Sequence, residues 1–343
     1  LPISAWETLD AACAPTATAM PAGPAADAAP EAAPALPAAA PAPAPAPVAP
    51  AAPAVAVLVA PPGAGKTTRV PLALLDAPWR GDGRIIMLEP RRLAARAAAG
   101  QMARLLGEEV GQTVGYRVRM DSKVSGRTRI EIVTEGVFTR MLLDDPELGG
   151  VAAVLFDEFH ERSLDGDLGL ALTLDAAALR PDLRVLVMSA TIDGARVAKL
   201  LGDAPVIESL GRAFPVETIH AEPDPLQRLD DQVTAAVLAA LRAHEGSALV
   251  FLPGKGEITR VAERLTGRVP ADTDIAPLYG QLTPAEQDRA IRPAEPGRRK
   301  VVLATSIAET SLTIDGVRIV IDAGFRRIPV YEPGTGLTTL ATS

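Results

Sequence analysis

The stretch from Val55 to Thr68, VAVLVAPPGAGKTT, combines residue types that bind phosphate. An apolar, β-branched run is followed by Ala-x-x-x-x-Gly-Lys-Thr, a pattern typical of a phosphate-binding loop between a buried strand and a helix. Its glycines let backbone N–H groups turn inward, and the start of the helix favours negative charge. A glycine-rich turn with a solvated lysine is the alternative, which the preceding strand disfavours. We therefore expect a nucleotide site formed by Gly63, Ala64, Gly65, Lys66, Thr67 and Thr68.

Two adjacent carboxylates supply the chemistry that such a loop lacks. Asp157 and Glu158 follow an apolar run at 151–156, which has the length of a buried strand. Asp157 would hold Mg²⁺ together with the Thr67 hydroxyl, and Glu158 would orient an attacking water while Lys66 reaches the β- and γ-phosphates. A solvated acidic pair at a strand end is the plain alternative. The phosphate loop earlier in the chain favours the catalytic interpretation.

Alternating strands and helices must position these residues. Apolar runs alternate with helical periodicity, which indicates an α/β fold with doubly wound, mostly parallel sheets. Ligands of such sheets bind beyond the carboxyl ends of the strands, where the residues above fall. The predicted strands are 55–59, 84–89, 115–118, 129–133, 151–156, 184–188, 248–252, 300–304 and 317–321, and the predicted helices include 91–106 and 231–244.

The chain divides into three segments. Residues 1–54 hold an alanine- and proline-rich tether, a composition that buries little and favours extended conformations. Residues 55–210 form the first compact unit, and prolines and glycines between 205 and 225 mark its end. The strand and helix alternation then restarts in residues 211–343 without a second phosphate loop. One loop for two units suggests a nucleotide bound in the cleft between them.

Composition restricts the class of protein. The formal net charge of -8 provides no overall attraction for nucleic acid, so such binding requires a local basic groove. Cys13 is the single cysteine and cannot form an intrachain disulfide, and no Cys/His cluster has zinc spacing. The uncharged stretch 32–65 contains too many prolines for a membrane helix, and Glu7 and Asp10 replace the basic start of a signal peptide. We expect a cytoplasmic protein.

Six motifs in order give a resemblance to a known family. DEFH at 157–160 resembles the DEAH-box signature of superfamily two helicases, with Phe159 in place of alanine. APPGAGKTTRVPLALL together with DEFHERS is similar to the bacterial HrpB-type branch. The resemblance covers about residues 55–340, and its other segments are LEPRRLAAR at 88–96 (motif Ia), TEGVF at 134–138 (Ib), SAT at 189–191 (III), LVFLPGKGEI at 249–258 (IV) and ATSIAETSLTIDG at 304–316 (V).

This resemblance implies two tandem RecA-like domains, the second incomplete, that bind ATP and Mg²⁺ and act on single-stranded RNA. It implies a monomer that holds the RNA backbone through Arg91, Arg92, Thr134, Gly136 and Thr305. Arginine and backbone N–H contacts to phosphate give the sequence-independent binding that a motor requires. By the same resemblance, His160, Ser189 and Thr191 couple the nucleotide site to the RNA channel, and Glu309 and Asp315 face the nucleotide cleft.

Plain structural roles stay open for several of these residues. Arg92 and Arg96 share a helical face that solvent could cover, and Ser189 and Thr191 could cap a helix. The chain also departs from the family pattern. Gln101 stands where many relatives have an arginine that stacks on the base, and Ser306 stands where many have asparagine.

A third departure bears on catalysis. The sequence contains no Gln-Arg-x-Gly-Arg segment, whose arginines neutralise charge in the transition state in this family. An arginine finger contributes about 10³ to 10⁵ in rate in phosphate-loop NTPases, so we expect ATP binding with weak hydrolysis. Two alternatives remain: a degenerate helicase that acts as a nucleotide-dependent RNA clamp, and a phosphate-loop ATPase that acts on DNA or protein.

Overall fold

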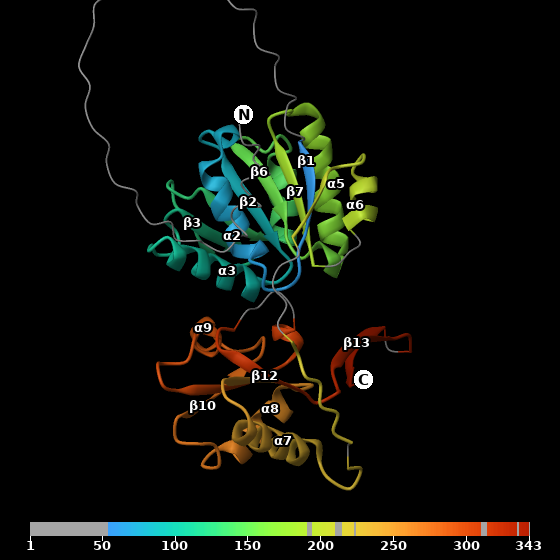
Figure 1. Cartoon of the computed structure of the whole chain (residues 1–343). Helices are drawn as coiled ribbons and strands as arrows, with labels where there is room; N and C mark the ends of the chain where they lie inside the picture. Colours follow the sequence, from blue (N-terminus) through green and yellow to red (C-terminus); the bar gives the residue numbers. More distant parts are fainter. Residues whose placement is uncertain are drawn as a thin grey trace, which may run out of the picture.

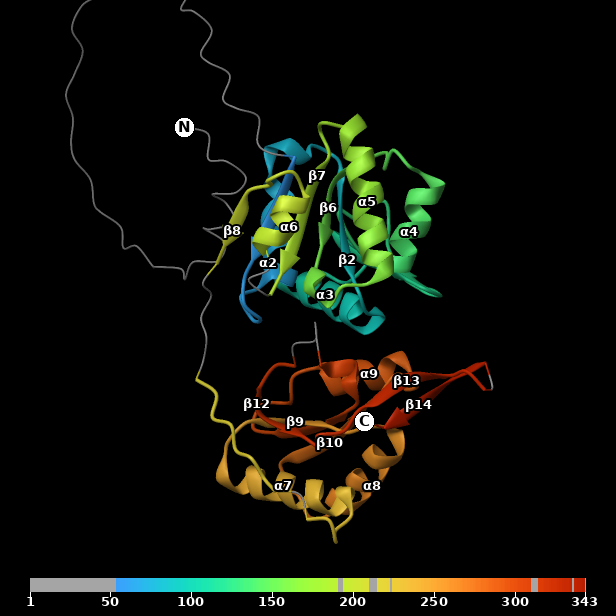
Figure 2. The same ribbon diagram turned by 90° about the vertical axis from the view of Figure 1, so that its right-hand side faces the viewer.

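The computed structural model describes residues 54–190, 194–209, 215–222, 224–309, 314–334 and 336–342. Apart from Ala54, the proposed tether over residues 1–54 lies outside this part of the chain. Figures 1 and 2 show two α/β units, one built around each of two sheets. None of the helices in the described ranges combines the length and the apolar character needed to cross a bilayer.

Eight strands form the sheet of the first unit, in the order β4-β3-β5-β2-β6-β7-β1-β8. Every neighbouring pair is parallel except β3 and β4. The predicted doubly wound, mostly parallel sheet is therefore confirmed. The strands are β1 (Val55–Val59), β2 (Arg84–Glu89), β3 (Val114–Val118), β4 (Asp121–Lys123), β5 (Ile130–Thr134), β6 (Val151–Phe156), β7 (Arg184–Ser189) and β8 (Val206–Glu208).

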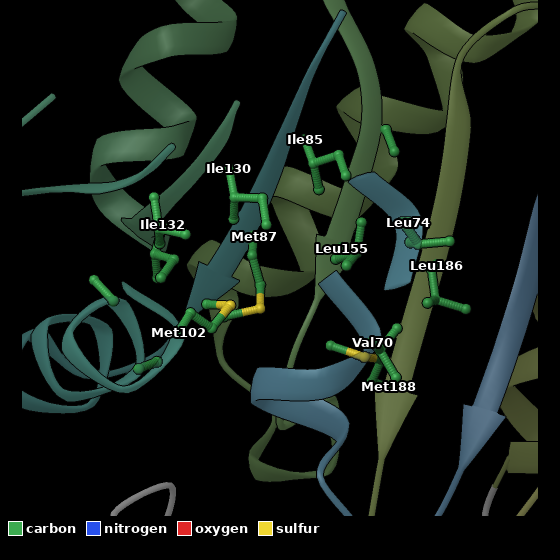
Figure 3. Packing of buried hydrophobic residues seen from close by; sticks show 14 of the residues in the cluster. Val70, Leu74, Ile85, Met87, Met102, Ile130, Ile132, Leu155, Leu186 and Met188 are labelled. Carbon is green, nitrogen blue, oxygen red and sulfur yellow. The ribbon is translucent and has the colours of Figure 1, made fainter. Parts of the chain in front are cut away.

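Helices cover both faces of this sheet, and alternate side chains of each strand reach opposite faces. On β2, Ile85 and Met87 pack in one cluster with Met102, as Figure 3 shows, whereas Ile86 and Leu88 pack in the other. The central strands are buried on both faces, which explains their continuous apolar runs. The helices are α2 (Lys66–Ala73), α3 (Arg92–Leu105), α4 (Glu135–Asp144), α5 (Leu164–Leu179) and α6 (Gly194–Leu200), with short 3-10 turns η1 (Leu74–Asp76), η2 (Pro78–Arg80) and η3 (Phe159–Glu161).

The second unit has a parallel sheet in the order β10-β11-β9-β12 and a separate antiparallel hairpin of β13 and β14. We did not predict β10 or the hairpin. The β10 segment TDIAPL lacks a clean apolar run and contains a proline, which is tolerated because β10 lies at the sheet edge. The elements are α7 (Leu229–Ala243), β9 (Ser247–Phe251), α8 (Lys255–Leu265), β10 (Thr273–Leu278), α9 (Pro284–Ile291), β11 (Arg299–Ala304), η4 (Ser306–Ala308), β12 (Val317–Asp322), β13 (Arg327–Glu332) and β14 (Leu337–Thr342).

Close packing of α6 fixes the strand that leads into the phosphate loop. A Cβ placed on Gly194, the first residue of α6, would lie 2.2 Å from Val59 Cγ2. We expect Gly194→Ala to destabilise the first unit by about 1–3 kcal/mol, because this overpacking must displace either α6 or the end of β1. Urea unfolding followed by circular dichroism measures the loss.

Gly100→Ala is the matched control. Gly100 lies inside α3, and a Cβ there meets no atom within 4 Å. Because alanine favours helix by about 0.5–1 kcal/mol over glycine, this variant should be neutral or slightly more stable. Equal effects of the two substitutions would contradict the packing argument.

Candidate nucleotide and nucleic-acid site

The phosphate loop joins the carboxyl end of β1 to α2, as its sequence predicts. Gly63 and Gly65 have φ of 79° and 89°, the left-handed region that glycine enters without steric cost. Gly65 is the N-cap of α2, so the free N–H groups of the first helical turn face the loop. Lys66 is only 5% exposed, and its Nζ donates to the carbonyls of Ala60 at 2.6 Å and Pro61 at 3.3 Å.

Asp157 lies directly after β6, at the same sheet edge as this loop. Its N–H donates to the carbonyl of Leu88 in β2 at 3.1 Å, and its Oδ1 accepts the Glu158 N–H at 2.8 Å. Burial raises the pKa of Asp157, while the Thr67 hydroxyl, the Glu158 N–H and the Lys66 ammonium act in the opposite direction. The structure thus brings Lys66, Thr67 and Asp157 together, although β1 and β6 are separated by β7.

Glu158 has a left-handed backbone conformation and a raised side-chain pKa. Its φ of 48° turns the chain sharply from β6 into η3. Burial, followed by the charge of Asp157, raises the pKa of Glu158 to about 7, and the nearby Lys66 lowers it. A carboxyl with this acidity accepts a proton from water more readily than an ordinary glutamate does.

His160 connects the DEFH and SAT segments. Its Nδ1 accepts the backbone N–H of Ala190 at 3.3 Å and lies 3.4 Å from Glu158 Oε2. Burial lowers the pKa of His160, which favours the neutral ring that accepts this hydrogen bond. Ser189 is buried at the end of β7, and its carbonyl accepts the N–H of Ala60. Thr191 lies outside the described residues, so its coupling role stays a prediction.

Phe159, which departs from the DEAH pattern, is half-buried and packs against the core of the first unit. Its ring lies edge-on to Phe156, with centroids 6.3 Å apart and planes at 82°. The guanidinium of Arg162 lies 5.3 Å from the Phe159 centroid. An aromatic ring at this position therefore anchors the turn that carries Glu158 and His160.

The donor set at Asp157 fits a magnesium ion. Asp157 Oδ2 is buried and has no hydrogen-bond partner among the described residues. No group of three acidic, histidine or cysteine side chains in the described ranges could enclose a metal ion alone. Mg²⁺ needs no such enclosure, because it retains several waters and is commonly bound by one or two protein ligands plus substrate phosphates.

The candidate RNA residues lie at the starts of two helices, which pack on opposite faces of the first sheet, and after one strand of the second unit. Arg91 precedes α3 and exposed Arg92 begins it. Thr134 is the N-cap of α4 and exposed Gly136 lies in its first turn. Because β2 and β5 are parallel neighbours, both helix starts lie at one sheet edge. Across the units, Arg91 Nη1 donates to the Ser306 carbonyl at 2.9 Å, which places Arg91 near Thr305.

Glu309 and Asp315 lie at opposite ends of the second sheet. Thr305 and Glu309 follow the carboxyl end of β11, whereas Asp315 precedes β12. The two strands run in the same direction on either side of β9, so the carboxyl end of β11 and the start of β12 lie at opposite ends of the sheet. Asp315 lines a cavity of about 390 Å³ together with Glu245 and Arg299. No described contact joins either acid to Lys66, and their nucleotide-facing role stays a prediction.

Comparisons with known proteins agree with this geometry. The family model described as DEAD/DEAH box helicase matches residues 48–200, and the helicase conserved C-terminal domain matches residues 224–331. The ATP-dependent RNA helicase HrpB of Escherichia coli (strain K12) is 54% identical over 287 residues, which are 83% of this chain and 35% of that protein.

The chain belongs to the DEAD/DEAH-box helicase family.

Two solved structures extend the match to three dimensions. The crystal structure of the E. coli DEAH/RHA helicase HrpB is 53% identical with a TM-score of 0.76, over 84% of this chain and 37% of that one. A structure described as the E. coli DExH-box NTPase HrpB is 53% identical with a TM-score of 0.67, over 84% and 36%. The expected tandem RecA-like fold is confirmed. The chain spans about a third of the length of these relatives.

Glu89 is a buried group beside these site residues that we did not predict. It ends β2, is 0% exposed, and its carboxyl lies within hydrogen-bonding reach of the Asp157 side chain. Burial and then the charges of Asp157 and Glu158 raise the pKa of Glu89 well above its ordinary value. A strand-end glutamate directly before Pro90 was the available signal.

This burial predicts a pH-dependent stability. The pKa of Glu89 is higher in the folded chain than in the unfolded chain, so between these two pKa values only the folded chain keeps the proton. In this pH range the free energy of unfolding decreases as the pH rises, by about 1.4 kcal/mol per pH unit. We expect Glu89→Gln to be more stable than the wild type at about pH 8, with a smaller difference at about pH 5. Urea unfolding in EDTA without nucleotide measures the free energy of unfolding.

Glu131→Gln provides the control. Glu131 is also buried, in β5, but it bonds Arg84 at 3.1 Å and Arg117 at 2.7 Å. This substitution should destabilise the unit at both pH values, because two guanidinium groups lose their anionic partner and one of them also loses its acceptor oxygen. A Glu89→Gln difference that does not grow with pH would contradict the proposed proton.

Proposed function

We propose that this chain is the ATP-dependent core of an RNA helicase. The observation that carries the proposal is the gathering of Lys66, Thr67, Asp157 and Glu158 at one sheet edge, in a unit whose Arg91 bonds Ser306 of the second unit. Residues 55–210 and 211–343 would be its two RecA-like domains. A relative at 54% identity named as an ATP-dependent RNA helicase supports the choice of substrate.

The phosphate loop would bind the nucleotide, and the acidic pair Asp157 and Glu158 would hold the metal ion and activate water. Backbone N–H groups from Gly63 to Thr68 would bind the phosphates, and Lys66 would exchange its carbonyl partners for phosphate oxygens. Mg²⁺, held by Thr67 and Asp157, would neutralise charge that develops on the β- and γ-phosphates. Glu158 would orient the attacking water and accept its proton, and its raised pKa suits that task.

Coupling to RNA would run through two contacts. His160 accepts the N–H of Ala190, so a change at Glu158 can reach the end of β7. Arg91, Arg92, Thr134, Gly136 and Thr305 would bind the RNA backbone with no reading of base identity. Hydrolysis would then alter the spacing of the two units and advance the strand. A monomeric state and a cytoplasmic location stay predictions.

ATP hydrolysis with and without single-stranded RNA tests this function. We expect RNA to raise turnover at saturating ATP, with Lys66→Ala as the blank, because loss of the loop ammonium removes nucleotide binding. RNA-stimulated turnover excludes a protein remodeller. Equal stimulation by duplex DNA, or RNA binding without any turnover, would contradict the motor and favour one of the two alternatives.

Glu158→Gln separates binding from chemistry. The amide keeps the shape of the side chain and loses the proton acceptor, so we expect turnover to fall about 10²- to 10⁴-fold. The affinity for a fluorescent ATP analogue should stay within about twofold, because binding rests on the loop. Normal turnover in this variant would remove Glu158 from the proposed mechanism.

A further inference from the structure

One face of α3 joins the first unit to the second. Leu93 is 4% exposed and packs in a cluster whose other members, including Leu278 and Ala290, belong to the second unit. Arg96 lies three residues further on, on the same helical face. Its Nη2 donates to Gln287 Oε1 at 2.9 Å and lies 3.5 Å from Asp288 Oδ1. Figures 1 and 2 both show α3 at the base of the first unit, facing α9.

A second contact lies at the start of the same helix. Arg91 Nη1 donates to the Ser306 carbonyl in η4 at 2.9 Å, and its Nη2 lies 3.4 Å from Glu161 Oε2. Both sides of this guanidinium therefore have acceptors, one from each unit. Arg91 is also a proposed RNA residue, and a phosphate group would need the same N–H donors.

The surface of α9 that receives Arg96 is held firmly. Thr283 and Glu286 form a capping box at its start, with both reciprocal hydrogen bonds present. Lys300 Nζ donates to the carbonyls of Arg289 at 2.8 Å and Arg292 at 2.6 Å at its end. Gln287 is only 8% exposed, and its Nε2 donates to the Tyr279 carbonyl at 3.4 Å. Its amide is therefore oriented with the oxygen toward Arg96.

We propose that the contact between α3 and α9 is a latch that lowers RNA affinity. Leu93 and Arg96 hold the second unit against α3 and thereby keep the Ser306 carbonyl on Arg91. RNA must displace the Ser306 carbonyl from Arg91. A stable contact between α3 and α9 therefore lowers the fraction of chains in which Arg91 is available, and the apparent RNA affinity falls in proportion to that fraction. The latch rests on the proposed RNA-binding role of Arg91.

Arg96 and Gln287 are the residues to test, because neither belongs to the proposed RNA or nucleotide site. Gln287→Leu removes the hydrogen bond from Arg96 Nη2 without changing net charge and leaves Asp288 in place, and its size suits the buried position. Loss of one hydrogen bond to a charged group should tighten binding of a fluorescent single-stranded RNA by about 10- to 150-fold without nucleotide. Arg96→Ala should also tighten it, although it removes a positive charge.

Arg104→Ala is the matched control. Arg104 lies on the same helix, and its guanidinium bonds Gln101 of α3 and no described residue of the second unit. It removes the same charge as Arg96→Ala, so RNA affinity should stay equal or weaken slightly. Thermal unfolding of each variant checks that the fold is intact.

Distances between spin labels at Arg140 and Glu263, on a Cys13→Ser background, report the latch directly. Both positions are exposed, in α4 and α8 respectively. We expect a narrow distribution in the wild-type chain and a broader one in Gln287→Leu. An unchanged RNA affinity and an unchanged distribution in Gln287→Leu would overturn the latch and leave the proposed function standing. Absence of RNA binding by wild type and variant alike would overturn both.

Discussion

The buried ammonium of Lys66 opposite a group of buried carboxyls is the interaction on which the nucleotide site depends. Lys66 lowers the pKa of both Asp157 and Glu158, whereas burial and the charges of Asp157 and Glu158 raise the pKa of Glu89. In an environment of low dielectric, each charge strongly affects the acidity of its neighbours. The site therefore has too few cations for its acids. A triphosphate would add further negative charge, which explains why a divalent cation and a ring of N–H donors suit this edge.

Parallel strands make this concentration of charge possible. Since β1, β2, β6 and β7 run in the same direction, their carboxyl ends meet at one edge, and residues far apart in sequence become neighbours. The continuous apolar runs of these strands hold that edge in place, because helices bury both faces of the sheet. Polar chemistry is confined to the strand ends. Glu89 and Asp157 are adjacent for this reason alone.

Helix α3 takes part in both the core of the first unit and the contact between the units. This helix supplies core side chains on one face, such as Met102, and interdomain contacts on another through Leu93 and Arg96. Its first residues are also the proposed RNA contacts. A helix that serves the core, the partner unit and a ligand transmits a shift of one to the others, because packed interfaces deform in discrete steps rather than continuously.

Sequence alone determined the central strands of both sheets, the phosphate loop and the family. Apolar runs of strand length located β2 and β6 with their observed ends, and the order of six motifs identified the helicase fold. Local signals were sufficient for these features because a buried strand and a phosphate loop are each encoded by consecutive residues. β10 and the β13–β14 hairpin were missed, since an edge strand with a proline carries little apolar periodicity.

Only the tertiary structure decided which separated residues meet. The sequence left a solvated helical face open as one alternative for Arg96, whereas in the structure Arg96 donates a hydrogen bond to Gln287 of the other unit. It likewise gave no reason to pair Glu89 with Asp157, or to part Asp315 from Glu309. Such pairings depend on strand order and on how two units dock, and these are set by the packing of the whole chain rather than by any local run of residues.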